Sequence, residues 1–176
     1  NSGYYEAKNG EILTFTISYF GNESNDRLVN LLVDLYKQEG IVLKIERLTY
    51  TSITQEIIAT RDFEILLYEV ETTIDPDQYN LWHSLKSNYP DLNLSGYDYE
   101  RVDILLEDGR KTVNKNIRKE RYSLFQKYLN TDAPVIFLYS PSYLYYVRNG
   151  WEGVDLSNMS YSYDRFNNIE NWYWKE

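Results

Sequence analysis

Two glutamates follow a stretch whose apolar residues alternate as they do in a β-strand. Phe63, Ile65 and Leu67 share one face of this predicted strand, and Glu69 and Glu71 continue that face at its end. Ligands of parallel sheets bind beyond the carboxyl ends of the strands, so these acids are candidates to bind an amine, a guanidinium, a sugar hydroxyl or a cation. A glycosidase acid pair needs a fixed separation across a cleft, which neighbours along one strand seldom provide. Two solvated acids are the remaining interpretation.

A second polar segment, Asp75-Pro76-Asp77, precedes a predicted short helix that carries Trp82 and His83. Asp75 is either a carboxylate of the binding site or the N-cap of this helix, with Pro76 as the first helical residue. His83 is the only histidine in the chain, so it cannot build a histidine-rich zinc site. No motif supplies a nucleophile and an acid around it. We therefore expect His83 to be structural or to line a ligand site.

The composition excludes several classes of function. The chain has no cysteine, so disulfides, thiol catalysis and cysteine-ligated zinc are excluded. Glycine-rich phosphate loops, nucleophile elbows and metalloprotease motifs are absent, so we expect neither an enzyme nor a cofactor. The net charge of −9 disfavours nucleic acid as a partner, because phosphate binding needs a basic footprint. Binding without catalysis is the function class that remains.

Aromatic residues are unusually frequent, with 19 tyrosines and 4 tryptophans. Tyrosine combines a large apolar ring with a polar tip, which suits surfaces that hold ligands or partners. Tyr143, Tyr145, Tyr146 and Trp151 are candidates for a stacking surface, and residues 161–174 for a segment that packs on another structure. A stand-alone carbohydrate-binding or adhesion module is therefore the alternative function, and drift in composition is the alternative explanation of the aromatic content.

The first 70 residues alternate between strand and helix patterns. Residues 13–19 and 41–45 alternate as strands, and leucines at helical spacing over residues 28–35 predict a helix that Gly40 ends. Ser52 and Gln55 predict a capping box for a short helix through Ile58. The third strand is predicted at residues 63–70. This order predicts an α/β fold with a mostly parallel sheet flanked by helices.

The second half of the chain has a weaker pattern. Residues 90–96 are expected to form a loop, and residues 99–109 a helix. A longer helix is predicted around residues 117–128, which Pro134 ends, and the apolar run 135–139 is predicted to be a short buried strand. No linker divides the sequence, so residues 1–176 are predicted to be a single domain.

Five stretches carry a resemblance to a known family. They are the lead-in at residues 3–13, the helix-to-strand junction at 35–45, the strand and loop at 63–84, the Asn93 to Leu106 segment, and the closing helix and strand at 121–139. In this order they resemble the carboxyl-terminal lobe of bacterial extracytoplasmic solute-binding proteins of family 5. These are the oligopeptide-, dipeptide- and nickel-binding receptors of ABC importers.

The resemblance implies one lobe of a periplasmic-binding-protein-like (type II) fold, which closes on its ligand with a second lobe. The missing amino-terminal lobe would carry a signal sequence and a lipid anchor, which implies an extracytoplasmic location. The implied partners are a small solute or short peptide and an ABC permease, with no catalysis. From strand-end position and from the resemblance, we expect the following residues to line the ligand cleft: Tyr68, Glu69, Glu71, Thr72, Asp75, Trp82, Asn93 and Ser95.

One departure from the family pattern concerns the ligand. Peptide-binding members place a tryptophan and then an aspartate before the proline, and that aspartate pairs with the peptide amino group. Counting back from Pro76, these places hold Glu69 and Thr72. Glu71 lies one residue away and could replace the missing acid, whereas a sugar or another solute would need no such acid.

Overall fold

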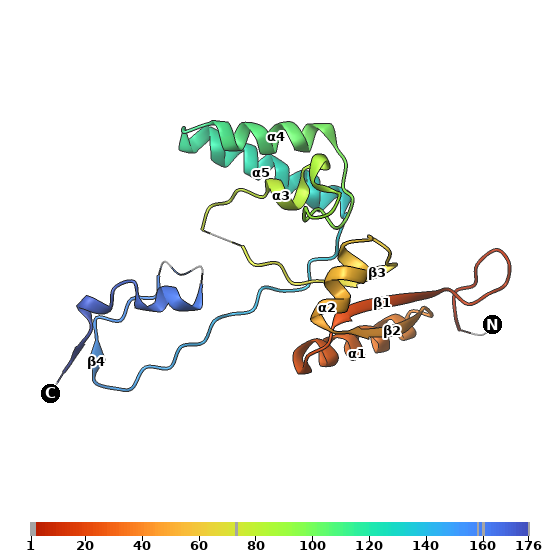
Figure 1. The fold of residues 1–176 in the computed structure, drawn as a ribbon, viewed down its shortest axis with the longest axis horizontal. Helices are drawn as coiled ribbons and strands as arrows, with labels where there is room; N and C mark the ends of the chain where they lie inside the picture. Colours follow the sequence, from red (N-terminus) through yellow and green to blue (C-terminus); the bar gives the residue numbers. More distant parts are fainter. Residues whose placement is uncertain (1–2, 73, 158, 160, 176) are drawn as a thin grey trace. The chain divides into compact units, whose positions relative to one another are not determined.

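The computed structural model describes residues 3–72, 74–157, 159 and 161–175, and the chain divides into two compact units. Figure 1 shows the helices and strands along the chain. Unit 1 consists of Asn1–Val70 and Leu85–Gly96. Unit 2 consists of Glu71–Ser84 and Tyr97–Glu176. No described helix is both long and apolar enough to cross a membrane.

Unit 1 is built on a three-stranded parallel sheet. Its strands are β1 (Thr14–Phe20), β2 (Val42–Leu48) and β3 (Ile65–Leu67), in the order β2-β1-β3. Ile17 of the central strand lies opposite Ile45 of β2 and Ile65 of β3. The predicted parallel sheet is thereby confirmed, and β1 is its most buried strand because it has neighbours on both edges.

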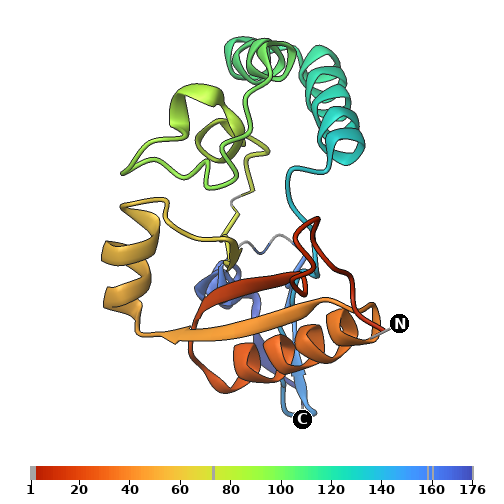
Figure 2. The same cartoon turned by 90° about the vertical axis from the view of Figure 1, so that its right-hand side faces the viewer.

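Helix α1 (Glu23–Gln38) packs along this sheet, as Figure 2 shows. The side chain of Asn22 caps it by accepting a hydrogen bond from the backbone N–H of Asn25 at 2.8 Å. Val29 is fully buried in the cluster that α1 forms with the sheet. Gly40 follows with a φ of +77°, and a Cβ there would lie 2.7 Å from the carbonyl oxygen of Gly3. Only glycine fits this helix-to-strand junction.

The helix between β2 and β3 begins earlier than predicted. Helix α2 (Tyr50–Ser52) continues into a π-helical turn, η1 (Ile53–Ile58). Its cap is Thr49, whose hydroxyl accepts a hydrogen bond from the N–H of Ser52 at 3.1 Å. The predicted capping role of Ser52 is therefore wrong, because a cap three residues upstream already satisfies its N–H.

Strand β3 is shorter than the predicted strand at residues 63–70. It pairs with β1 only over Ile65–Leu67. One residue earlier, the carboxylate of Glu64 accepts a hydrogen bond from the backbone N–H of Thr16 at 2.6 Å. The hydrogen bond to the Glu64 side chain thus takes the place of a backbone hydrogen bond between the strands. Residues 68–70 are exposed beyond the end of β3.

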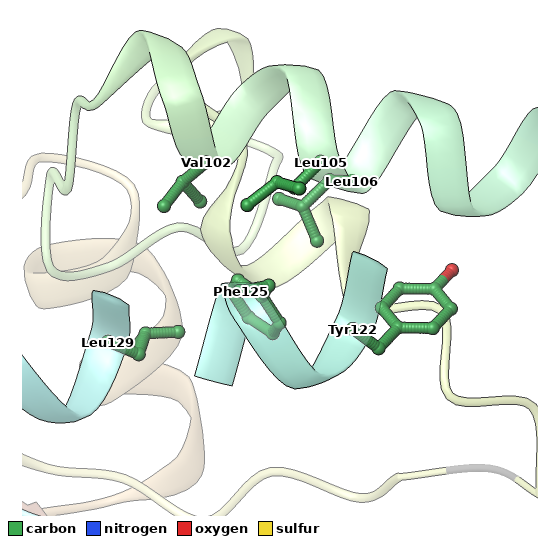
Figure 3. Close-up of a cluster of buried hydrophobic side chains, with 6 residues drawn as sticks. All are labelled: Val102, Leu105, Leu106, Tyr122, Phe125 and Leu129. Atoms are coloured by element: carbon green, nitrogen blue, oxygen red, sulfur yellow. The ribbon is translucent and has the colours of Figure 1, made fainter. Parts of the chain in front are cut away.

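Unit 2 is built on a pair of packed helices, α4 (Glu100–Lys111) and α5 (Lys115–Asp132), joined by a three-residue connection. Figure 3 shows the apolar residues that the two helices bury against each other: Val102, Leu105, Leu106, Tyr122, Phe125 and Leu129. A Cβ on Gly109 would lie 2.9 Å from the Tyr122 ring, so the missing side chain makes room for this ring. The shorter helix α3 (Tyr79–Trp82) packs against the same cluster, and η2 (Ser84–Lys86) follows it.

The predicted buried strand at residues 135–139 is not formed. Ile136 is 72% exposed and Phe137 is 70% exposed, and the structure assigns no strand to this run. An apolar run forms a strand only beside another strand, and none of the described strands pairs with it. The later elements are β4 (Trp151–Glu152), η3 (Ser162–Phe166), η4 (Ile169–Asn171) and β5 (Tyr173–Trp174), with β4 and β5 antiparallel.

Candidate functional site

The residues predicted to line the cleft are divided between the two units. Unit 1 holds Tyr68, Glu69, Asn93 and Ser95, and unit 2 holds Glu71, Thr72, Asp75 and Trp82. The assembly of these two groups into one cleft remains a prediction.

The strand-end residues are available to a ligand. Tyr68 and Glu69 follow β3 directly, and both are exposed. Glu71 and Thr72, at the start of unit 2, are exposed as well. The carboxylates of Glu69 and Glu71 are therefore exposed to solvent. A cationic group of a ligand can reach them there, beyond the end of the strand.

Asn93 and Ser95 belong to the loop of residues 90–96. Asn93 is fully buried, and its amide oxygen accepts a hydrogen bond from the Ser95 hydroxyl at 3.0 Å. Its backbone N–H donates to the carbonyl of Lys86 at 3.0 Å. Asn93 therefore holds the loop in place, whereas Ser95 is the exposed member of the pair.

Arg61 is a second anchor of this loop that the sequence analysis missed. Its guanidinium donates to the backbone carbonyls of Ser87 at 3.1 Å and Asp91 at 2.5 Å. Burial lowers the pKa of Arg61, and the charge of Asp91 opposes that shift. The sequence does not predict this role of Arg61, because its partners are backbone carbonyls and every residue carries one.

Trp82 is part of an aromatic group in unit 2. Its ring centroid lies 6.0 Å from that of Phe137, 6.4 Å from that of Tyr97 and 6.5 Å from that of Phe125. These are separations at which aromatic rings attract one another beyond simple burial. Trp82 is only partly buried. Its ring is held by these neighbouring rings, and the exposed part presents a rigid apolar surface.

His83 lies between two acids but does not form a catalytic triad. Its Nδ1 is 3.6 Å from Asp103, its Nε2 is 3.4 Å from Glu107, and the residue is 3% exposed. The hydroxyl of Ser84 donates to Asp103 at 2.5 Å, as does its backbone N–H at 2.9 Å. The serine thus binds the acid rather than the imidazole, which is the reverse of what a triad requires. The arrangement fixes the segment that carries Trp82.

Asp75 does not cap helix α3, which starts at Tyr79. Its carboxylate accepts a hydrogen bond from the N–H of Asp77 at 2.9 Å and one from Arg118 at 2.6 Å. These bonds, that from Arg118 first, lower the pKa of Asp75. Asp77 in turn accepts from the N–H of Tyr79 at 3.0 Å. The N-cap interpretation is wrong because consecutive turns at both aspartates delay the helix.

The predicted aromatic surface is formed in part. The rings of Tyr143 and Tyr145 stack with an interplanar angle of 11°, and Arg165 donates to the Tyr143 hydroxyl at 3.0 Å. Trp151 pairs instead with Trp174 across β4 and β5, with ring centroids 5.9 Å apart. Tyr146 is exposed. Among the described residues, no group of three histidine, aspartate or glutamate side chains is arranged to hold a metal ion.

No family model matches the chain. A sequence relative is protein XP55 of Streptomyces lividans, which is 28% identical over 158 residues, covering 87% of this chain and 28% of the relative. The oligopeptide-binding protein AppA of Bacillus subtilis, solved in complex with a nonapeptide, matches all of this chain and 34% of its own, with 22% identity and a TM-score of 0.72. NikZ of Campylobacter jejuni, in complex with Ni(L-His), matches 97% of this chain and 36% of its own, with 22% identity and a TM-score of 0.68.

The chain has the fold of one lobe of these solute-binding proteins. This confirms the resemblance that the sequence carries and the predicted periplasmic-binding-protein-like fold, with helices flanking a small parallel sheet. A protein of the same fold from Thermotoga maritima was solved with bound mannohexaose, at a TM-score of 0.62 and 17% identity over 76% of this chain and 26% of its own. The chain spans between 26% and 36% of the length of these relatives.

Proposed function

We propose that the chain is the carboxyl-terminal lobe of an extracytoplasmic receptor that binds a solute and delivers it to an ABC permease. The observation that carries the proposal is the match of the whole chain to the oligopeptide-binding protein AppA. Ligand capture between two lobes requires no chemical step, so catalysis is not part of this function. The closed, ligand-bound form differs from the open form in shape, and a permease that prefers it responds to the solute.

The exposed apolar run at residues 135–139 supports the lobe interpretation. Ile136, Phe137 and Tyr139 face solvent, although runs of this composition are usually buried. A contiguous apolar stretch of this kind indicates a contact surface. The proposal assigns it to the remainder of a longer receptor, which also supplies the amino-terminal lobe, the signal sequence and the lipid anchor.

The proposed ligand is a short peptide, with Glu71 as the partner of its amino group. The residue expected to be aspartate in peptide receptors is Thr72 here, whose hydroxyl carries no charge. Asp75 is already paired with Arg118, so it is not a free carboxylate for the ligand. Glu71 is exposed and is the nearest acid to the expected position. Its carboxylate matches an ammonium group in charge and in hydrogen-bonding capacity.

The test compares Glu71→Gln with Glu39→Gln, at an exposed position outside the predicted cleft, in the complete protein. It uses calorimetry with tetrapeptides whose amino ends are free or acetylated. A hydrogen bond to a charged group contributes about 1.5–3 kcal/mol, which corresponds to a loss of roughly 10- to 150-fold in affinity. Glu71→Gln is expected to show this loss for the free peptide only, while Glu39→Gln retains affinity. If both variants bind the free peptide as tightly as the parent protein, the assignment of Glu71 is wrong.

A stand-alone carbohydrate-binding or adhesion module remains the second candidate. The stacked rings of Tyr143 and Tyr145 favour it, since such platforms bind sugar faces. Removal of these rings in a Tyr143→Ala/Tyr145→Ala variant would abolish binding of the chain to oligosaccharides. The peptide proposal predicts that the same variant leaves the affinity for peptides unchanged.

A further inference from the structure

A hollow of about 310 Å³ lies on unit 2, along the first half of helix α5. It is lined by the following residues: Pro76, Lys115, Arg118, Lys119, Tyr122, Ser123 and Gln126. None of these residues belongs to the predicted solute site. Three of them are cations, in a chain whose net charge is −9.

Two of the three cations of this hollow, Lys115 and Lys119, differ from their neighbours in pairing. Around them, Arg110 pairs with an aspartate at 2.9 Å and Lys111 with a glutamate at 2.7 Å, and Arg121 lies 3.4 Å from each of two acids. Lys115 and Lys119 have no acid within 4.0 Å among the described residues. Arg118 pairs with Asp75 at 2.6 Å, so the two lysines carry the positive charge of the hollow that no described acid neutralises.

The position of these lysines on the helix adds to this imbalance. Lys115 is the first residue of α5 and Lys119 follows one turn later, and the first turn holds no acid. The amino end of a helix already carries partial positive charge and favours negatively charged groups. The lysines there add to the positive charge. The side chain of Asn114 accepts from the backbone N–H groups of Asn116 and Ile117, so the free donors of the hollow are side chains.

A buried hydroxyl completes the arrangement. Tyr122 lines the hollow and is 6% exposed, and its hydroxyl makes no close hydrogen bond among the described residues. Burial raises the pKa of this hydroxyl, and the neighbouring Arg118 guanidinium opposes the rise. Buried polar groups nearly always form a hydrogen bond, so this hydroxyl is able to form one with a bound ligand. The hydroxyl of Ser123 and the amide of Gln126 supply further donors along the same wall.

We infer that this hollow binds the phosphate group of a small phosphorylated solute. Lys115, Arg118 and Lys119 supply three cations against the single carboxylate of Asp75, which Arg118 engages. A phosphate dianion has the charge to balance them and more acceptor oxygens than a carboxylate. The hollow is larger than a phosphate ion, which leaves room for the group that carries it. None of the residues that line the hollow belongs to the predicted solute site, although Asp75 of that set pairs with Arg118 of the hollow. The inference does not rest on the proposed solute site.

The test uses pyrophosphate as the probe, with calorimetry on the full chain at low ionic strength. The parent chain is expected to bind pyrophosphate, and acetate far more weakly. A Lys115→Ala/Lys119→Ala variant is expected to lose at least tenfold in affinity. The matched control, Lys44→Ala/Lys127→Ala, removes the same charge from exposed positions outside the hollow and is expected to retain binding.

A further variant tests the hydroxyl. Tyr122→Phe keeps the buried ring and removes only the unpaired oxygen, so it is expected to weaken pyrophosphate binding without lowering the melting temperature. Equal losses in the two double-lysine variants would show that binding follows net charge and would overturn the inference. So would absence of pyrophosphate binding by the folded parent chain, with folding checked by circular dichroism.

Discussion

The carboxylate of Asp103 is predicted to hold the segment that carries Trp82. It accepts two hydrogen bonds from Ser84, at 2.9 Å from the backbone N–H and 2.5 Å from the hydroxyl. Replacement by asparagine keeps the shape but removes the charge and one acceptor oxygen. Hydrogen bonds to charged groups contribute about 1 kcal/mol more than neutral ones, so the two bonds together predict a loss of about 2 kcal/mol.

This loss is measured by thermal unfolding of the full chain at pH 7, followed by circular dichroism. For a chain of this size, 1 kcal/mol shifts the melting temperature by about 2–4 °C, so Asp103→Asn is expected to lower it by roughly 4–8 °C. The control is Asp98→Asn, which removes the same charge from an exposed position whose side chain makes no hydrogen bond with the described residues. Equal melting temperatures for the two variants would refute the assigned role of Asp103.

Three further outcomes follow from burial and charge. Leu106→Ala, at a fully buried position, is expected to cost about 2–5 kcal/mol in urea unfolding, whereas Val113→Ala, at a position 99% exposed, stays within about 0.5 kcal/mol; similar costs would contradict the described core. The pKa of Asp75 is lowered in the folded chain, so its stabilising contribution is present above its ordinary pKa and lost as the pH falls through the lowered value. The stability difference between the parent chain and Asp75→Asn is therefore expected at pH 7 and should disappear in acid; a difference independent of pH would argue against it. Phe137→Ser is expected to reduce self-association of the isolated chain in ultracentrifugation. Unchanged association would show that this residue is not part of an apolar contact surface.

The sheet of unit 1 was predictable because its signals are local. Alternation over residues 13–19 and 41–45, with helical spacing between them, indicated parallel strands on either side of a helix, and β1, α1 and β2 follow. Helix starts were less predictable. Thr49 and Ser52 are both acceptable caps, and only the folded backbone shows which hydroxyl is used.

The apolar run at residues 135–139 shows where local pattern fails. Its composition is that of a buried strand, but a strand needs a partner, and the sequence of one segment does not say whether a partner exists. Arg61 was missed for a related reason. It anchors the 90–96 loop through the carbonyls of Ser87 and Asp91, and such contacts depend on three-dimensional proximity alone.

The sequence predicts the candidate site as a set of residue types and does not predict its geometry. Exposure of Tyr68 and Glu69 beyond β3 agrees with their strand-end position. The roles of Asn93 and Asp75 were not visible, because one binds its own loop and the other binds Arg118, 43 positions away. Both residues still position the segments that carry their exposed neighbours.

The central claim is that the solute is held between this lobe and a second one, and it is tested by comparing two proteins in one assay. The affinity for a tetrapeptide with a free amino end is measured by calorimetry for the complete receptor and for the 176-residue chain alone. The two-lobe account predicts that the complete receptor binds the peptide at least a hundredfold more tightly, since the chain alone provides only part of the contact. Equal affinities would contradict it, because the chain would then bind its ligand without a second lobe.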